Sequence, residues 1–134
     1  MGLERLTPEG LFKPAAYTQV VVATGRRMIF VSGQVSIGAD GNLVAPGDIA
    51  GQARQVYANL RTALEGAGAT AGDVVKLTTY VVGYTPAFRP LLGEARSTVF
   101  GPATLPASTL VGVQALAEPG YLIEVEAIAV TDPA

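Results

Sequence analysis

The chain has 134 residues, a formal net charge of −2, and neither histidine nor cysteine. This length suits one domain with a hydrophobic core, so we expect a single domain over residues 1–134. Without histidine or cysteine, the chain cannot build a zinc site from those ligands, nor a Ser-His-Asp or Cys-His catalytic centre. Acid–base chemistry would fall to Asp, Glu, Tyr, Lys, a terminus or water.

Charge and hydropathy narrow the choice of partners. Charged residues make up 15% of the chain, against a norm of about 25%, and mean hydropathy is +0.38. This composition favours apolar surface buried between subunits, although abundant alanine and valine offer a simpler explanation. The basic residues are scattered, so we expect no nucleic-acid partner. With no long apolar run and no secretion signal, we expect no membrane partner and a cytoplasmic location.

In chain order, the first predicted elements are a β-hairpin and a helix. β-Branched residues at 17–23 and apolar residues at 28–32 predict two strands joined by a turn at 24–26. Asp48 is a good N-cap for a helix that runs to about Gly66. Its apolar residues form one helical stripe: Ile49, Ala53, Val56, Tyr57, Leu60, Ala63 and Leu64.

The second half predicts a strand, a helix and a closing pair of strands. A strand covers 73–82, and a helix of about 87–100 follows Pro86. The closing strands, 107–116 and 121–131, flank a Glu-Pro-Gly sequence typical of a type II turn. The order β-β-α-β-α-β-β predicts an α+β two-layer sandwich. One sheet face would pack on the helices, and the other would be covered from outside the chain.

The last strand carries two carboxylates. Glu124 and Glu126 are two residues apart, so they share a strand face at a spacing of roughly 7 Å. That arrangement suits an acid–base pair, or else carboxylates that tie strands or subunits together. Lys76 likewise has two interpretations: a buried amine of lowered pKa, or a salt-bridged or snorkelling side chain.

Five segments together resemble one family. In order they are KPAAYTQ (13–19), FVSGQV (30–35), QARQVYANL (52–60), DVVKLTTYV (73–81) and IEVEAIAV (123–130). They resemble the Rid proteins, also called RidA or YjgF and formerly endoribonuclease L-PSP, over almost the whole chain. The resemblance implies a chorismate-mutase-like fold and a homotrimer with a pocket at each subunit interface. It also implies hydrolysis of imines and enamines such as 2-aminoacrylate to a 2-keto acid and ammonia, with no metal or cofactor.

The resemblance also assigns site residues. Glu124 matches the pocket glutamate that positions the hydrolytic water, and Glu126 matches a second glutamate that we interpret as structural. The residues that would contact the substrate are Tyr17, Ser32, Gly33, Leu92 (or its neighbour Leu91), Ser108, Thr109 and Leu110, the last through its backbone.

One departure from the family pattern bears on the substrate. Deaminating members carry an arginine in a P-A-R-S motif that pairs with the substrate carboxylate. Here Ser108 takes that place, and losing such a clamp costs a factor of about 10² in binding. Arg89 and Arg96 are the only candidates to replace it. Leu92 and Ala16 also stand at positions that are often polar and proline, respectively, so we expect a less polar pocket.

Three functions therefore stay open. The first is hydrolysis of an imine, an enamine or a related labile metabolite that is neutral, amphiphilic or larger than 2-aminoacrylate. On this hypothesis we expect little activity on 2-aminoacrylate itself. The second is a non-catalytic module that binds a small ligand. The third is a ribonuclease, which the acidic composition and the lack of a basic patch disfavour.

Overall fold

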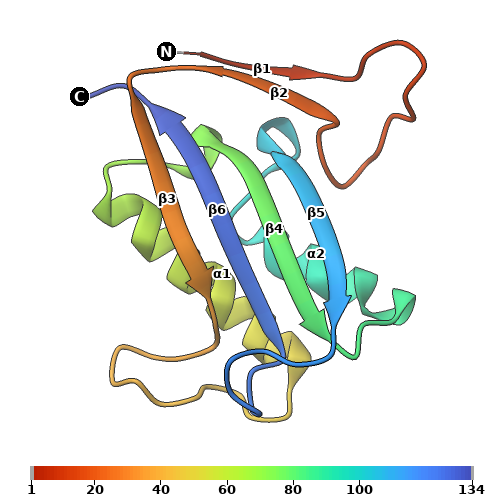
Figure 1. Ribbon diagram of the computed structural model, residues 1–134, viewed down its shortest axis with the longest axis vertical. Helices are drawn as coiled ribbons and strands as arrows, with labels where there is room; N and C mark the ends of the chain where they lie inside the picture. The colour runs from red at the N-terminus through yellow and green to blue at the C-terminus, as the bar shows by residue number, and fades with distance from the viewer. Residues whose placement is uncertain (1, 134) are drawn as a thin grey trace.

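The computed structural model describes residues 2–133, which form two sheets and two α-helices (Figure 1). The two-stranded sheet is β1–β2, and the four-stranded sheet has the order β3-β6-β4-β5. The strands are β1 (Gly2–Leu6), β2 (Val20–Thr24), β3 (Arg27–Gln34), β4 (Val74–Val82), β5 (Ala107–Val113) and β6 (Ile123–Thr131). The helices are α1 (Ile49–Gly66) and α2 (Arg89–Ser97), with 3-10 turns at Ala71–Asp73, Pro86–Phe88 and Pro102–Thr104.

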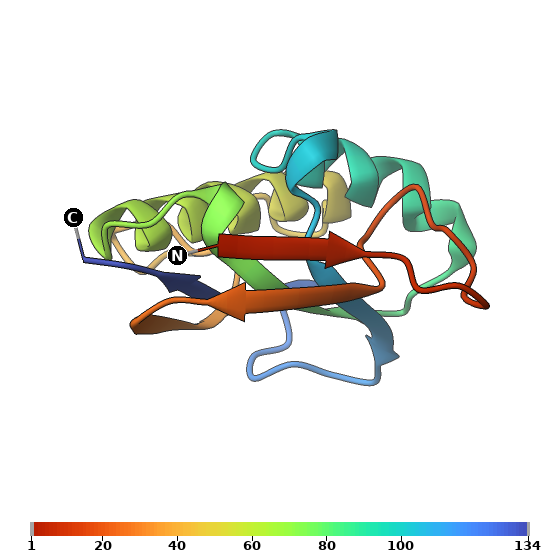
Figure 2. The same ribbon diagram turned by 90° about the horizontal axis from the view of Figure 1, so that it is seen from above.

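The layers confirm the predicted α+β sandwich. Both helices lie on one face of the four-stranded sheet, and β1 and β2 run across its end (Figure 2). The opposite face of the sheet has no layer over it in residues 2–133. Also within these residues, no helix is long and apolar enough to cross a membrane.

Helix α1 forms as the sequence predicts. The Asp48 side chain accepts a hydrogen bond from the Gly51 amide at 3.1 Å, which satisfies one free N–H of the first turn. The predicted stripe faces the sheet, but it also includes a buried Gln52. The Gln52 amide donates to the Gly120 carbonyl at 3.0 Å and accepts from the Leu122 N–H at 3.0 Å. Gln52 thereby ties α1 to the segment that leads into β6.

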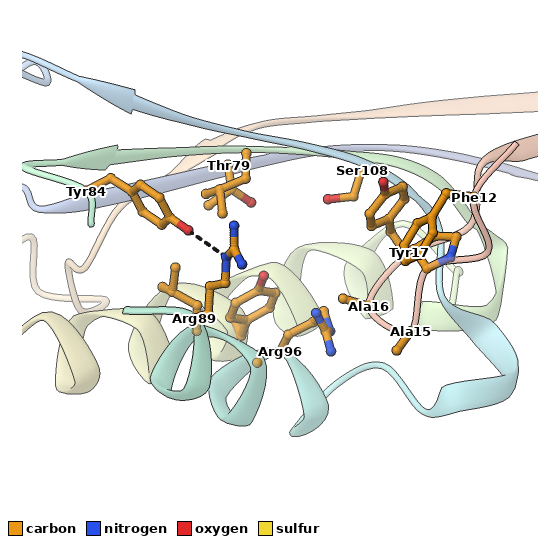
Figure 3. Close-up of a pocket in the computed structure, with 14 residues that line it drawn as sticks. Phe12, Ala15, Ala16, Tyr17, Thr79, Tyr84, Arg89, Arg96 and Ser108 are labelled. Atoms are coloured by element: carbon orange, nitrogen blue, oxygen red, sulfur yellow. Dashed lines mark hydrogen bonds between the residues drawn. The ribbon is translucent and has the colours of Figure 1, made fainter. Parts of the chain in front are cut away.

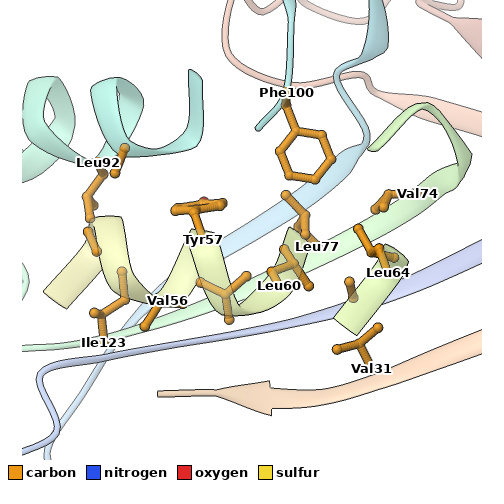
Figure 4. Close-up of a cluster of buried hydrophobic side chains, with 14 of the residues drawn as sticks. Val31, Val56, Tyr57, Leu60, Leu64, Val74, Leu77, Leu92, Phe100 and Ile123 are labelled. Carbon is orange, nitrogen blue, oxygen red and sulfur yellow. The ribbon is translucent and has the colours of Figure 1, made fainter. Parts of the chain in front are cut away.

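The core lies between the helices and the covered sheet face (Figure 4). Tyr57 and Phe100 meet edge to face, with ring centroids 6.4 Å apart. The aliphatic side chains that fill this layer are almost completely buried: Val56, Leu60, Leu64, Val74, Leu77, Val81, Ile123 and Val125.

The predicted N-terminal hairpin is wrong. Strand β2 pairs with β1, which the sequence analysis missed, and β3 pairs with β6 instead. Between β2 and β3, Gly25 sits so close to β6 that an added Cβ would lie 2.9 Å from the Thr131 carbonyl oxygen. The chain therefore turns a tight corner at Gly25 and sends the two strands into different sheets.

The two closing strands do not pair with each other. Strand β5 runs parallel to β4, and β6 inserts between β3 and β4, antiparallel to both. The intervening turn does form, with the Tyr121 amide donating to the Glu118 carbonyl at 3.1 Å. It is not type II, because Gly120 does not adopt a positive φ. The second helix begins at Arg89 rather than 87, after a 3-10 turn, and ends at Ser97.

Candidate functional site

A cavity of about 670 Å³ lies between α2, the edge strand β5 and the loop that contains Phe12 and Tyr17 (Figure 3). This volume is within the range of small-molecule sites. Four of the predicted substrate-binding residues line it together: Tyr17, Leu92, Ser108 and Leu110.

Strand register explains why Ser108 reaches this cavity. Ser108 pairs with Leu77, whose side chain is buried under the helices, so both residues point to the helix side of the sheet. Leu92 approaches from α2, where it is largely buried. Tyr17 closes the far end and keeps 36% of its surface exposed. The side chain of Leu110 is 41% exposed, so it can offer more than its backbone.

The cavity also contains Arg89 and Arg96, the two candidates to replace the missing carboxylate-binding arginine. Arg89 and Arg96 both extend from α2 into the space below the sheet (Figure 3). Arg89 Nε donates to the Tyr84 hydroxyl at 3.3 Å. Arg96 Nε is buried and has no hydrogen-bond partner among residues 2–133. Neither guanidinium forms an ion pair in that part of the chain.

Three polar residues of the cavity were missed by the sequence analysis: Tyr57, Thr79 and Tyr84. Burial raises the pKa of Tyr57, while the positive charge of Arg96 and a hydrogen bond with Thr79 oppose that rise. The Tyr57 hydroxyl therefore stays protonated at neutral pH. Its place on α1 gave no signal, because an aromatic residue in an apolar stripe is also typical of core.

A second group of predicted residues lies on the uncovered face of the sheet. Glu124 and Glu126 share that face, as predicted from their spacing. The Glu124 carboxylate packs against Gly33 so closely that a Cβ at position 33 would overlap it. Glycine at this position is thus what lets the carboxylate lie against the strand.

Glu126 has a partner of its own. The Tyr80 hydroxyl donates to Glu126 Oε1 at 2.9 Å. This hydrogen bond is the main reason that the pKa of Tyr80 is raised, and partial burial and the charges of Glu126 and Glu124 add to it. The contact agrees with the structural interpretation of Glu126.

Ser32 and Thr109 also lie away from the large cavity. Ser32 borders a shallow depression of about 240 Å³ together with Lys76 and Glu126. Lys76 Nζ donates to Thr109 Oγ1 at 2.7 Å, and Lys76 has no ion-pair partner among residues 2–133. Of the interpretations left open for Lys76, the salt bridge is therefore absent there.

The single chain thus divides the predicted site residues into two groups. Tyr17, Leu92, Ser108 and Leu110 lie on the helix side, whereas Ser32, Gly33, Thr109 and Glu124 do not line that cavity. The sheet itself separates the two groups. No cluster of three or more acidic side chains suited to a metal ion occurs in residues 2–133.

A family model described as endoribonuclease L-PSP matches residues 11–131. The chain belongs to this family, which is also known as the Rid or YjgF family. A RutC family protein of Pyrococcus abyssi is 35% identical over 129 residues, which cover 96% of this chain and 98% of the relative. The 2-iminobutanoate/2-iminopropanoate deaminase of Escherichia coli is 39% identical over 104 residues, covering 77% and 79% of the two chains.

Solved structures of Rid proteins have the same fold. YyfB of Yersinia pestis, a Rid-family protein of unknown function, superposes with a TM-score of 0.88 at 36% identity. The alignment covers 97% of this chain and 99% of that one. Escherichia coli TdcF with bound serine gives a TM-score of 0.65 at 28% identity, covering 90% and 91%.

Proposed function

We propose that this Rid protein hydrolyses an imine or enamine without a cofactor, in a pocket that two subunits of a homotrimer complete. The proposal is supported by the way the polar groups of the protein are divided between the two sides of the sheet. The cavity beside Ser108 is lined by arginines, tyrosines and a threonine but by no carboxylate. Glu124 lies outside it, and no group in residues 2–133 donates a hydrogen bond to its carboxylate.

The uncovered sheet face supports association of subunits. Phe30 and Met28 of β3 are 68% and 62% exposed on this face, and Val111 of β5 is 39% exposed. A monomer that left these side chains in water would forgo their burial, worth about 25 cal/mol per Å². If this face of one subunit packs against the β5 edge of its neighbour, these side chains are buried and Glu124 approaches the cavity that β5 lines.

The chemistry needs few groups. A water oxygen bonds to the imine carbon, the π electrons move to nitrogen, and the Glu124 carboxylate accepts the proton that water loses. The nitrogen then takes up two protons, one returned by Glu124 and one lost by the new hydroxyl. The C–N bond breaks, and ammonia leaves as that oxygen becomes the carbonyl. Tyr17 and Ser108 would hold the substrate by hydrogen bonds. The deaminase name of the Escherichia coli and rat relatives supports this class of reaction.

The test is hydrolysis of imines generated by an amino acid oxidase from alanine, leucine and phenylalanine. We expect the protein to accelerate hydrolysis of the larger imines more than that of 2-iminopropionate, because Ser108 lacks the clamp for a small carboxylate. Glu124→Gln should lower the rate by about 10²–10⁴. Glu118→Gln, in the exposed turn before β6, is the matched control and should leave the rate unchanged.

Ser108→Arg sharpens the same test. The variant should gain activity on 2-iminopropionate, because a guanidinium pairs with a carboxylate through two hydrogen bonds. Full native activity on 2-iminopropionate would contradict the argument about the missing clamp. If neither the native protein nor Ser108→Arg accelerates hydrolysis of any imine, the proposed hydrolase activity is refuted. That result would favour a non-catalytic protein that binds a small ligand.

A further inference from the structure

The large cavity holds two cations and no anion. Arg89 and Arg96 both line it, and its other lining residues are uncharged. No salt bridge among residues 2–133 involves either arginine. Arginine side chains in proteins carry a permanent positive charge. The cavity is therefore strongly positive, although the chain as a whole carries a net charge of −2.

Arg96 is the less satisfied of the two. Its Nε is buried without a hydrogen-bond partner in the described chain, which is unusual for a charged donor. Arg89 is exposed and already donates to the Tyr84 hydroxyl. A buried N–H of a guanidinium is costly to leave unpaired, so it marks a place where an acceptor from a ligand would be stabilised.

The rest of the lining describes the remainder of the ligand. Phe12, Tyr17, Tyr84, Leu92 and Leu110 present aromatic and aliphatic surface to the same space. A volume of about 670 Å³ is larger than a three-carbon acid needs. The complementary molecule is a carboxylate with an apolar or aromatic group attached.

We propose that Arg96, assisted by Arg89, binds the carboxylate of the ligand in this cavity and thereby takes over anion recognition from the strand position that Ser108 occupies. This inference rests on the proposed function and names its substrate class. Among the neutral, amphiphilic or larger substrates expected from the sequence, it selects a larger, amphiphilic one that carries a carboxylate, because the anion is held from α2 rather than from β5. Tyr17 and Leu110 then set the preference for an apolar group.

The experiment is calorimetric titration of the intact protein with three stable carboxylates: propionate, phenylacetate and 3-phenylpropionate. Each is compared with its neutral amide. We expect at least one aromatic carboxylate to bind tenfold or more tighter than its amide. Arg96→Gln should abolish that preference, and Arg96→Lys should restore part of it, because lysine keeps the charge but not the two-pronged donor. Arg54→Gln is the control, since Arg54 is exposed on α1 and lines neither of the two cavities described above.

The outcomes separate this inference from the proposed function. Equal binding of every acid and amide, or a preference that survives in Arg96→Gln, would overturn the role of Arg96 even if imines were hydrolysed. A preference for the carboxylate that depends on Arg96, without hydrolysis of any imine, would support the role of Arg96 and refute the proposed hydrolase activity. Circular dichroism checks that each variant is folded. If Arg96→Gln does not fold, Arg96→Lys provides the test. We expect a weaker preference for the carboxylate in Arg96→Lys, and an unchanged preference would contradict the role of Arg96.

Discussion

The two faces of the four-stranded sheet are built from alternate residues of the same strands, yet they have opposite characters. On the covered face, Leu77 and Val125 are 1% and 0% exposed and pack under the helices. On the uncovered face, Phe30 is 68% exposed and borders the same depression as the polar side chains of Lys76 and Glu126. The contrast teaches that alternation along one strand serves folding on one side and leaves the other side available for the assembly and chemistry proposed above.

The largest expected effect comes from breaking the covered face. Leu77→Ala should lower the free energy of unfolding by about 2–5 kcal/mol, because the buried leucine leaves a cavity that the helices cannot fill. Chemical denaturation at several protein concentrations measures it. A loss under 1 kcal/mol would contradict the role of this face as the core.

The next effect comes from placing a charge on the uncovered face. Phe30→Glu should convert the assembly to monomers of 13.7 kDa, because burying the carboxylate between subunits is unfavourable. Light scattering after size exclusion gives the mass. Leu11→Glu, an exposed apolar position in the loop before β2, is the control and should keep the native mass. A native protein that is monomeric at all concentrations would refute assembly through this face.

The smallest expected effect is a pH dependence of the folding stability that arises from Tyr80. Its pKa is raised in the folded state, so the folded protein holds the phenol proton more tightly than the unfolded chain does. The resulting stabilisation is fully present below the unfolded pKa of about 10 and disappears as pH rises through the higher folded value. Tyr80→Phe should therefore differ from the native protein in stability at neutral pH and converge with it at strongly alkaline pH.

Spectroscopy checks the assignment. Absorbance titration of tyrosinate in Glu126→Gln should show one tyrosine titrating at lower pH than in the native protein, because the carboxylate that accepts the hydrogen bond from the Tyr80 hydroxyl is gone. Identical titration curves for the two proteins would contradict the Tyr80–Glu126 interaction.

Local patterns predicted local structure well. The stripe after Asp48 predicted α1 together with its N-cap, because helix periodicity and capping depend on residues a few positions apart. The spacing of Glu124 and Glu126 predicted their common face for the same reason. The buried Gln52 escaped notice, because its partners Gly120 and Leu122 are about seventy residues away along the chain.

By itself, the sequence determined the α+β class, the buried face of α1 and the placement of two carboxylates on one side of a strand. Tertiary structure decided which strands pair: β5 runs parallel to β4, and β6 lies between β3 and β4. It also decided that Arg89 and Arg96 share a cavity with Ser108, while Glu124 lies elsewhere. The physical reason is that periodicity records which side a residue faces, whereas pairing and cavities arise from contacts between segments far apart in the chain.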